Sequence, residues 1–428
     1  MTETDQSQRP ESALGTRRVV LPGMVGNVLE WYDFALYGYL APVIAQLFFP
    51  SHDPLAGLVQ TYAVFAIGFL ARPIGGAIFG HLGDRLGRRT MLTWSISMMA
   101  LPTCLLGLLP TYASIGEWAP FLLVLLRLLQ GMSSGGEFSG SITFMVEHAH
   151  PSRRGLVGSL AESSAMAGGL LGACVGWLVS DLLPTDALHD WGWRLPFLSG
   201  VIVAAFGLWI RIGIPDTPAF EANKNQDKLE RWPLLGAFRE QKRAMLVCIG
   251  LSWGSSAGYF VIYTWFVGYM RDVLSLPLHT AVGIGTLGLL LGLLSTIAAG
   301  YLADRFGARR VLTIAMIVNV VAAIPLMSLA SVGTIWSVVA AQFSLALLLS
   351  GLLGTLPAFY VTLFSSALRC TAFSASYNVS VAVYGGTAPL IATLLIQQTG
   401  WSIAPGLYIC AAMLVSLVAL RFAPRNNS

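Results

Sequence analysis

Twelve long apolar runs, separated by short polar segments, constrain this chain more than any other feature of its sequence. A helix needs about 20 mostly apolar residues to cross the hydrocarbon core of a bilayer, and each run is long enough to do so. Only 11% of the 428 residues are charged, against roughly a quarter in a soluble domain. The sequence therefore predicts an all-α polytopic membrane protein with twelve transmembrane helices, at residues 19–47, 57–81, 89–110, 119–147, 155–180, 193–213, 243–270, 279–303, 310–330, 334–363, 370–398 and 402–422.

The basic residues orient these spans. If the N-terminus is cytoplasmic, 21 of the 25 Lys and Arg residues lie on the cytoplasmic side. The outer loops then hold only Arg194 and Arg271, and Arg72 and Arg127 lie inside the membrane. Cytoplasmic loops carry an excess of Lys and Arg, so both termini are predicted to be cytoplasmic, with the chain in the plasma membrane, which is the inner membrane in a bacterium. The basic residues form no compact patch, and no nucleic-acid partner is expected.

One long polar stretch divides the chain. It joins spans six and seven, lies on the inner side and mixes charges of both signs, so it is predicted to be a linker with room for one surface helix. The predicted organisation is a tail, a six-helix bundle, the linker, a second six-helix bundle and a short tail. Their bounds are 1–18, 19–214, 215–242, 243–422 and 423–428.

A loop motif occurs twice, at residues 80–92 and at residues 300–312. Such a repeat, at equivalent places in the two halves, indicates two pseudo-symmetric bundles, an arrangement found in transporters that rock around a midplane site. Its glycines permit a tight turn, and its charges can pair with each other, with a helix end or with the opposite half. We therefore predict a gating role, the alternative being a basic loop that only sets topology. The predicted gating residues are Gly80, Asp84, Arg85, Gly87, Arg88, Arg89, Gly300, Asp304, Arg305 and Gly307.

These two loops resemble the signature of the major facilitator superfamily. Six further motifs resemble its metabolite:proton symporter family, at residues 26–34, 69–76, 127–137, 191–197, 216–220 and 377–386. The resemblance implies the major facilitator fold and a secondary active transporter that imports a small polar metabolite with protons. That family includes proline/betaine, α-ketoglutarate and citrate carriers. Ala308 stands where the family usually has Arg, so the second loop is expected to gate less strongly.

Ionisable side chains inside the spans are candidates for function, because burying them in a bilayer is costly. Glu30 and Asp33 are three residues apart and share a face of span one, near the midplane. Two carboxylates at this spacing repel when both are ionised, so one can take up and release a proton. Proton coupling is predicted at Glu30, Asp33, Glu137 and Arg127. The alternative is that the acids only pair with Arg72 and Arg127 to hold the spans together.

The same interior charges predict the substrate class. The planar fork of Arg suits a carboxylate, whereas the second half has no Asp or Glu after Asp304 and is expected to supply shape, stacking and neutral hydrogen bonds. Glu162 resembles the acidic residue of proline/betaine carriers; it would repel a multiply charged anion and can face a quaternary ammonium group. The predicted substrate-binding residues are Asn27, Arg72, Arg127, Glu162, Tyr263, Tyr377 and Asn378. The cargo is expected to be a zwitterion such as proline or betaine, with a di- or tricarboxylate as the alternative and a transporter-like sensor as a remote one.

Enzymatic functions are not supported by the sequence. The six His residues lie at span ends or in loops, and the five Cys residues lack the spacing of a metal site. We expect no enzymatic activity, no metal and no cofactor. The expected partners are a small molecule, protons and the lipid bilayer, and the protein is expected to act as a monomer.

Overall fold

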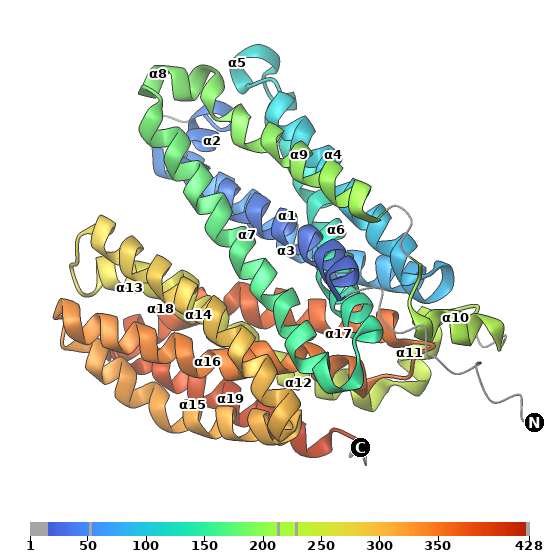
Figure 1. The fold of residues 1–428 in the computed structure, drawn as a ribbon. Coiled ribbons are helices and arrows are strands. Elements are labelled where there is room, and N and C mark those ends of the chain that lie inside the picture. The colour runs from blue at the N-terminus through green and yellow to red at the C-terminus, as the bar shows by residue number, and fades with distance from the viewer. Residues whose placement is uncertain (1–15, 51–53, 212–214, 227–229, 425–428) are drawn as a thin grey trace, which may run out of the picture.

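The computed structural model describes residues 16–50, 54–211, 215–226 and 230–424, and all regular structure in these ranges is helical (Figure 1). The first half consists of α1 (Thr16–Tyr39), α2 (Ala41–Phe48), α3 (Pro54–Leu86), α4 (Arg88–Leu108), α5 (Tyr112–Ile115), α6 (Trp118–His148), η1 (Pro151–Arg153), α7 (Arg154–Leu182), α8 (Thr185–Ala187), η2 (Leu188–Gly192) and α9 (Arg194–Arg211). The linker contains α10 (Pro218–Asn225) and α11 (Pro233–Glu240). The second half consists of α12 (Lys242–Tyr259), η3 (Phe260–Trp265), α13 (Phe266–Asp272), α14 (Leu278–Phe306), α15 (Ala308–Ser331), α16 (Ile335–Leu363), α17 (Arg369–Ser380), η4 (Val381–Gly385), α18 (Gly386–Thr399) and α19 (Ala404–Phe422).

The long helices correspond to the predicted spans. In the described residues, nine helices are long and apolar enough to cross a membrane, or ten when the bent pair that ends in α9 counts as one span. The other two predicted spans are α1 and α6, which hold most of the buried charges of the first half and are therefore less apolar. The all-α polytopic fold is confirmed.

The structure corrects the continuity of three predicted spans. The first ends at Tyr39, and the chain turns at Leu40 into the separate helix α2, which has a proline in its first turn. The seventh and eleventh each contain a π-helical turn, η3 and η4. Such turns occur often at functional sites. In the linker, two short helices form where one was expected.

The helix packing of the first half recurs in the second. Contacts of α1 with α7, α3 with α6 and α4 with α9 are repeated as α12 with α17, α14 with α16 and α15 with α19. Two seams join the halves, one between α17 and α3 and the other between α7 and the pair α14 and α16. The internal repeat found in the loops therefore extends through the packing of both halves.

The two halves lie closest together at the end of the molecule that carries α10 and α11, here called the linker end, and farther apart toward α5, α8 and α13 (Figure 1). Glycines make this close approach possible. A Cβ at Gly80 would lie 2.7 Å from the Cα of Thr371, and a Cβ at Gly300 would overlap the Ser159 side chain. These two motif glycines thus mark the places where the halves touch.

Glycines also bring α3 and α6 into backbone contact, which leads to a test of the packing. A Cβ at Gly131 would overlap the carbonyl group of Gly68. We expect Gly131→Ala to lower the free energy of unfolding by about 1–3 kcal/mol, the usual cost of overpacking. Gly169→Ala is the matched control, since a Cβ there meets nothing within 4 Å. Thermal unfolding in detergent measures both variants, and equal midpoints would contradict this account of the interface.

Candidate functional site

A small cavity of about 30 Å³ lies between the two halves. Helices α1, α6 and α7 line it from one side, and α12, η3, α16, α17 and η4 line it from the other. The lining residues are Trp31, Phe138, Glu162, Ser255, Ser256, Tyr259, Phe260, Leu353, Leu356, Pro357, Tyr360, Tyr377 and Val381. Both π-helical turns contribute to it, η3 through Phe260 and η4 through Val381.

The cavity combines aromatic walls with one charge. The rings of Trp31 and Tyr259 meet edge to face at 5.5 Å, and those of Phe138 and Tyr377 stack at 5.1 Å. Glu162 is the charged side chain among the described lining residues, and its carboxylate has no hydrogen-bond or ion-pair partner in the described part of the chain. The indole N–H of Trp31 is likewise buried and unpartnered there. The walls thus offer a cation a carboxylate and π faces, and offer an anion one N–H donor.

Asp33 and Arg127 form a fully buried ion pair within the first half. Their atoms Oδ2 and NH1 are 2.5 Å apart. Gln130 bridges the pair, accepting from Arg127 at 2.8 Å and donating to Asp33 at 2.8 Å, while the hydroxyl of Thr103 donates to Asp33 at 3.0 Å. The guanidinium also lies over the Tyr37 ring, 4.3 Å from its centroid. This network positions a titratable carboxylate among polar partners, away from the cavity lining.

Glu30 and Arg72 form a second buried pair, with 2.8 Å between Oε1 and NH1. The Nε of Arg72 donates to Asn378 Oδ1 at 3.2 Å, so this network crosses from α3 to α17. The two carboxylates predicted to interact with each other are therefore each neutralised by a separate arginine.

The remaining predicted site residues lie in different places. Asn27 donates to the Ala161 carbonyl at 3.1 Å and accepts from Ser141 at 3.0 Å, which joins α1 to α7 and α6. Glu137 is buried on α6. Tyr263 donates to the Ala346 carbonyl at 3.5 Å. Of the seven predicted substrate residues, the structure brings Glu162 and Tyr377 into the cavity lining, and it places the other five outside.

At the linker end, Asp84 closes the seam between α3 and α17. Its two carboxylate oxygens accept from the backbone N–H groups of Cys370 and Thr371, at 3.1 and 2.8 Å. These amides belong to the first turn of α17, where the helix dipole favours a negative charge. Arg88, not its neighbour Arg85, pairs with Asp84, at 3.3 Å, and Arg85 is exposed.

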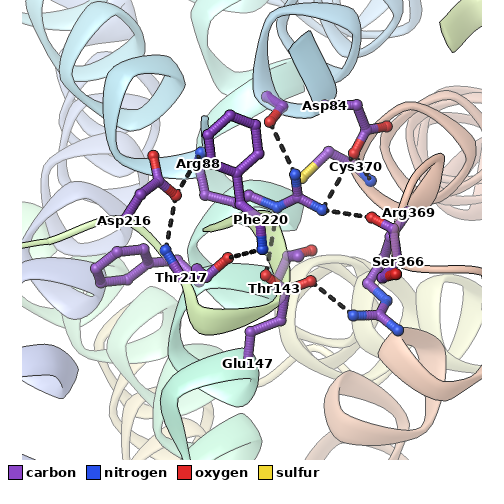
Figure 2. Close-up of polar contacts among 12 residues, drawn as sticks. Asp84, Arg88, Thr143, Glu147, Asp216, Thr217, Phe220, Ser366, Arg369 and Cys370 are labelled. Carbon is purple, nitrogen blue, oxygen red and sulfur yellow. Dashed lines mark hydrogen bonds and ion pairs between the residues drawn. The ribbon is translucent and has the colours of Figure 1, made fainter. Parts of the chain in front are cut away.

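Arg88 is the centre of a larger cluster that sequence reasoning did not assemble (Figure 2). Its Nε is 3.3 Å from Glu147 Oε2, and its guanidinium lies 5.4 Å from the centroid of the Phe220 ring in the linker. Glu147 also binds Arg369 of the second half, at 2.6 Å. These contacts connect both halves and the linker. The Arg88–Glu147 contact is buried, Arg369 is partly exposed, and the linker joins through the Phe220 ring. The sequence signal that could have pointed to this cluster is Glu147, an acid at the end of predicted span four.

Asp216 in the linker anchors the start of α4. It accepts from the backbone N–H groups of Arg88 at 3.0 Å and Arg89 at 3.3 Å (Figure 2). Burial raises the pKa of the Asp216 carboxyl above its ordinary value, and these N–H groups oppose the shift by favouring the ionised form. Gly87, the residue before Arg88, has φ of 103°, and a Cβ there would overlap the Asp216 carboxylate.

The second loop repeats only part of this arrangement. Asp304 accepts from the N–H groups of Gly155 at 2.6 Å and Leu156 at 2.8 Å, at the start of α7. Ala308 takes the place of Arg88, so the second loop has no counterpart of the central guanidinium. Gly307 again has a positive φ, of 89°, and Arg305 is exposed. The contact at Asp84 therefore includes the buried guanidinium of Arg88, whereas the contact at Asp304 consists of backbone N–H groups at the start of a helix. No group of three or more His, Cys, Asp or Glu in the described ranges is arranged to hold a metal ion.

Two pseudo-symmetric sets of helices, with a seam on either side of a cavity between them, are the architecture of a secondary transporter. Residues 23–377 match the sequence model of the Major Facilitator Superfamily, and the chain belongs to this family. The proline/betaine transporter of Escherichia coli is 34% identical over 417 residues, covering 94% of this chain and 82% of that protein. The ectoine/proline transporter ProP of Corynebacterium glutamicum is also 34% identical, over 94% and 83%. The proton:xylose symporter XylE, bound to 6-bromo-6-deoxy-D-glucose, matches in fold with a TM-score of 0.76 over 95% of this chain and 94% of that chain, at 16% identity.

The cluster around Arg88 leads to a second test. Glu147→Gln removes the anion that Arg88 and Arg369 share. Because a buried polar group that loses its partner costs about 1–3 kcal/mol, we expect the contact between the halves at the linker end to weaken by that amount. The amides of Cys370 and Thr371 should then exchange their hydrogens faster by roughly tenfold or more. Hydrogen exchange of the purified protein measures this effect.

The control for that variant is Asp272→Asn, which makes the same chemical change in the exposed pair Arg271–Asp272. An exposed pair contributes about 0–1 kcal/mol, so α17 exchange should stay unchanged. Equal exchange rates in wild type and Glu147→Gln would show that the cluster does not hold the seam closed.

Proposed function

We propose that this transporter imports a small zwitterion, of the proline or betaine type, together with protons, by alternating access. The observation that carries the proposal is Glu162, an unpartnered carboxylate in the aromatic-lined cavity between the halves. Curated relatives named as proline/betaine and ectoine/proline transporters support the same class of cargo.

The cavity matches the two ends of such a molecule. The Glu162 carboxylate and the rings of Tyr259 and Tyr377 attract a quaternary or secondary ammonium group. The carboxylate of the substrate can accept from the indole N–H of Trp31, which is buried and unpartnered among the described residues. A ligand that satisfies both groups replaces the hydration that each has lost on burial.

A di- or tricarboxylate fits these walls less well. Arg72 and Arg127, the cations that would hold its carboxylates, are paired with Glu30 and Asp33 and do not line the cavity. The charged group present, Glu162, repels a second carboxylate. No observation on the described residues specifically favours the sensor alternative.

Asp33 and Glu30 are the proposed proton carriers, and Arg127 and Arg72 are their partners. Protonation of either carboxylate removes half of an ion pair and leaves a buried guanidinium to find another partner. That change in pairing is the proposed means by which proton binding alters the packing of the first half. Glu137, buried on α6 in the same half, completes the proposed proton-handling group.

In the membrane, the proposed orientation places the linker end and both termini in the cytoplasm, because that end carries most of the basic residues. Residues 19–214 and 243–422 are proposed to move as two bundles, joined by the linker 215–242, in a monomer without a nucleic-acid partner. The closed contacts of Asp84 and Asp304 then correspond to a state that is shut toward the cytoplasm.

The cargo is tested by uptake into proteoliposomes of labelled betaine, proline, α-ketoglutarate and citrate, with and without an inward proton gradient. We expect saturable uptake of a zwitterion that the gradient drives above equilibrium. Preferential uptake of citrate or α-ketoglutarate would favour the carboxylate alternative. Uptake of every compound that ignores the gradient would contradict proton symport.

Glu162 is tested in the same vesicles. Glu162→Gln keeps the shape and removes the charge, so we expect the KM for betaine to rise about tenfold or more, which corresponds to ~1.4 kcal/mol, with a smaller rise for Glu162→Asp. Glu117→Gln is the matched control, because Glu117 is exposed, lies outside the cavity lining and accepts from the half-buried Tyr112. An unchanged KM in Glu162→Gln would place the cation of the substrate elsewhere.

Proton coupling is tested with Asp33→Asn. The neutral side chain cannot release a proton, so we expect substrate exchange down its gradient to persist while proton-driven accumulation falls to the level of equilibration. Counterflow and gradient-driven uptake in the same preparation separate the two activities. Full accumulation by the variant would exclude Asp33 as the essential carrier.

A further inference from the structure

One side chain of the second half makes direct contact with the proton-handling charges of the first half. Arg72 donates in two directions, from NH1 to Glu30 Oε1 at 2.8 Å and from Nε to Asn378 Oδ1 at 3.2 Å. All three residues are at most 1% exposed. A buried guanidinium in the first half is therefore shared between a titratable carboxylate and an amide on α17.

The Asn378 amide is also bonded on its other side. Its Nδ2 donates to the Gly135 carbonyl of α6 at 2.7 Å and to the Ser374 carbonyl of its own helix at 2.8 Å. Gly76 leaves the room for this contact, since a Cβ there would lie 2.8 Å from Nδ2. Asn378 thus fastens α17 to α3 and α6 at once, with its carbonyl oxygen directed to the only partner of the three that carries a charge.

Asn378 belongs to a row of contacts along one face of α17. Cys370, Ser374 and Asn378 are four residues apart and share that face. The Cys370 amide binds Asp84, the Ser374 hydroxyl lies 2.6 Å from that of Ser139, and Asn378 binds Arg72. Asn378 is the member next to the cavity, because its neighbour Tyr377 lines it.

The other seam has no equivalent contact in the described residues. On α7, the Ser163 hydroxyl donates to the Leu293 carbonyl of α14 at 3.3 Å, and Gly155 binds Asp304 near the linker end. Neither contact involves a guanidinium. A change of charge at Glu30 can therefore alter a contact between the halves directly in the seam between α3 and α17, where Arg72 binds Asn378.

We propose that Asn378 is a coupling residue, which transmits the protonation state of Glu30 to α17 through Arg72 and so controls the opening of the linker end. The guanidinium is planar and rigid, so NH1 and Nε move together. While Glu30 is ionised, its charge-assisted bond fixes the guanidinium and keeps Asn378 bound. When Glu30 is protonated, that bond weakens, the guanidinium reorients and the innermost contact of the seam is lost.

The charges around Glu30 are compatible with this role. Arg72 on α3 and Glu137 on α6 act on its carboxylate, while Asp33 on its own helix is neutralised by Arg127. Glu30 and Asp33 therefore each pair with a different arginine. When Glu30 loses its negative charge, the arginine whose ion pair changes is Arg72. The inference rests on the proposed proton symport, but its test requires neither substrate nor a proton gradient.

The test is a double-mutant cycle read by hydrogen exchange along α17 in the purified, full-length protein. Glu30→Gln mimics the protonated acid and should speed exchange of the α17 amides about tenfold or more at constant pH. Asn378→Ala should speed it as well, and adding Glu30→Gln to Asn378→Ala should have no further effect. Additive effects of the two substitutions would overturn the proposal, whatever the uptake assays show.

Two further variants keep the outcome clear. Asn319→Ala removes another buried amide, bonded to the Ala315 and Leu348 carbonyls within the second half, and the effect of Glu30→Gln should persist in it. Asn378→Asp gives Arg72 a second carboxylate, although it removes the two bonds that Nδ2 donates. Because that carboxylate holds the guanidinium whatever the charge of residue 30, exchange along α17 should become insensitive to Glu30→Gln. If Asn378→Ala does not yield folded protein, Asn378→Asp decides alone, and faster exchange when Glu30→Gln is added to Asn378→Asp would refute the proposal.

Discussion

A charge buried in a bilayer must be neutralised close by, because neither lipid nor packed helices can solvate it. The first half obeys this constraint with two separate pairs, Asp33 with Arg127 and Glu30 with Arg72. Each pair ties α1 to a different neighbouring helix, α6 or α3. Glu162 departs from the rule within the described residues, since its carboxylate faces the cavity without a partner. Because an unpaired buried charge is costly, we propose that the cargo supplies the missing cation.

At the linker end, backbone N–H groups take the place of arginine as partners of two acids. Asp84 and Asp304 each accept two backbone N–H groups at the first turn of a helix of the opposite half. A helix start offers such donors only in one place and direction, so each contact requires one defined arrangement of the two halves. Arg88 adds a guanidinium beside Asp84, whereas Ala308, at the equivalent position of the second loop, adds no charge beside Asp304. The two seams are therefore built to differ in strength, although the repeat made them topologically equivalent.

The fold was largely predictable because its signals are local. Apolar run length predicts a spanning helix, and a repeated motif predicts a repeated bundle, as α3 and α14 show. The breaks were not predictable, since a π-helical turn such as η3 depends on tertiary packing, here against α18, α13 and other helices of the second half. Of the residues predicted to bind substrate, Glu162 and Tyr377 line the cavity, whereas Arg72 lies outside it in an ion pair with Glu30. Sequence spacing identifies which charges are buried, but only tertiary contacts decide which of them are already neutralised.

The uneven distribution of acids has a mechanical consequence. All proposed proton chemistry lies in the first half, while the second half contributes aromatic walls and neutral amides, so a change of protonation must reach the second half through contacts across the seams. Charged side chains of the first half reach α17 through Asp84 at its first turn, through Glu147 at Arg369 and through Arg72 at Asn378. The first two lie at the linker end, remote from the cavity. Arg72 alone of these connects a proposed proton carrier with a helix that lines the cavity, and so it is where proton binding and the packing of the halves meet.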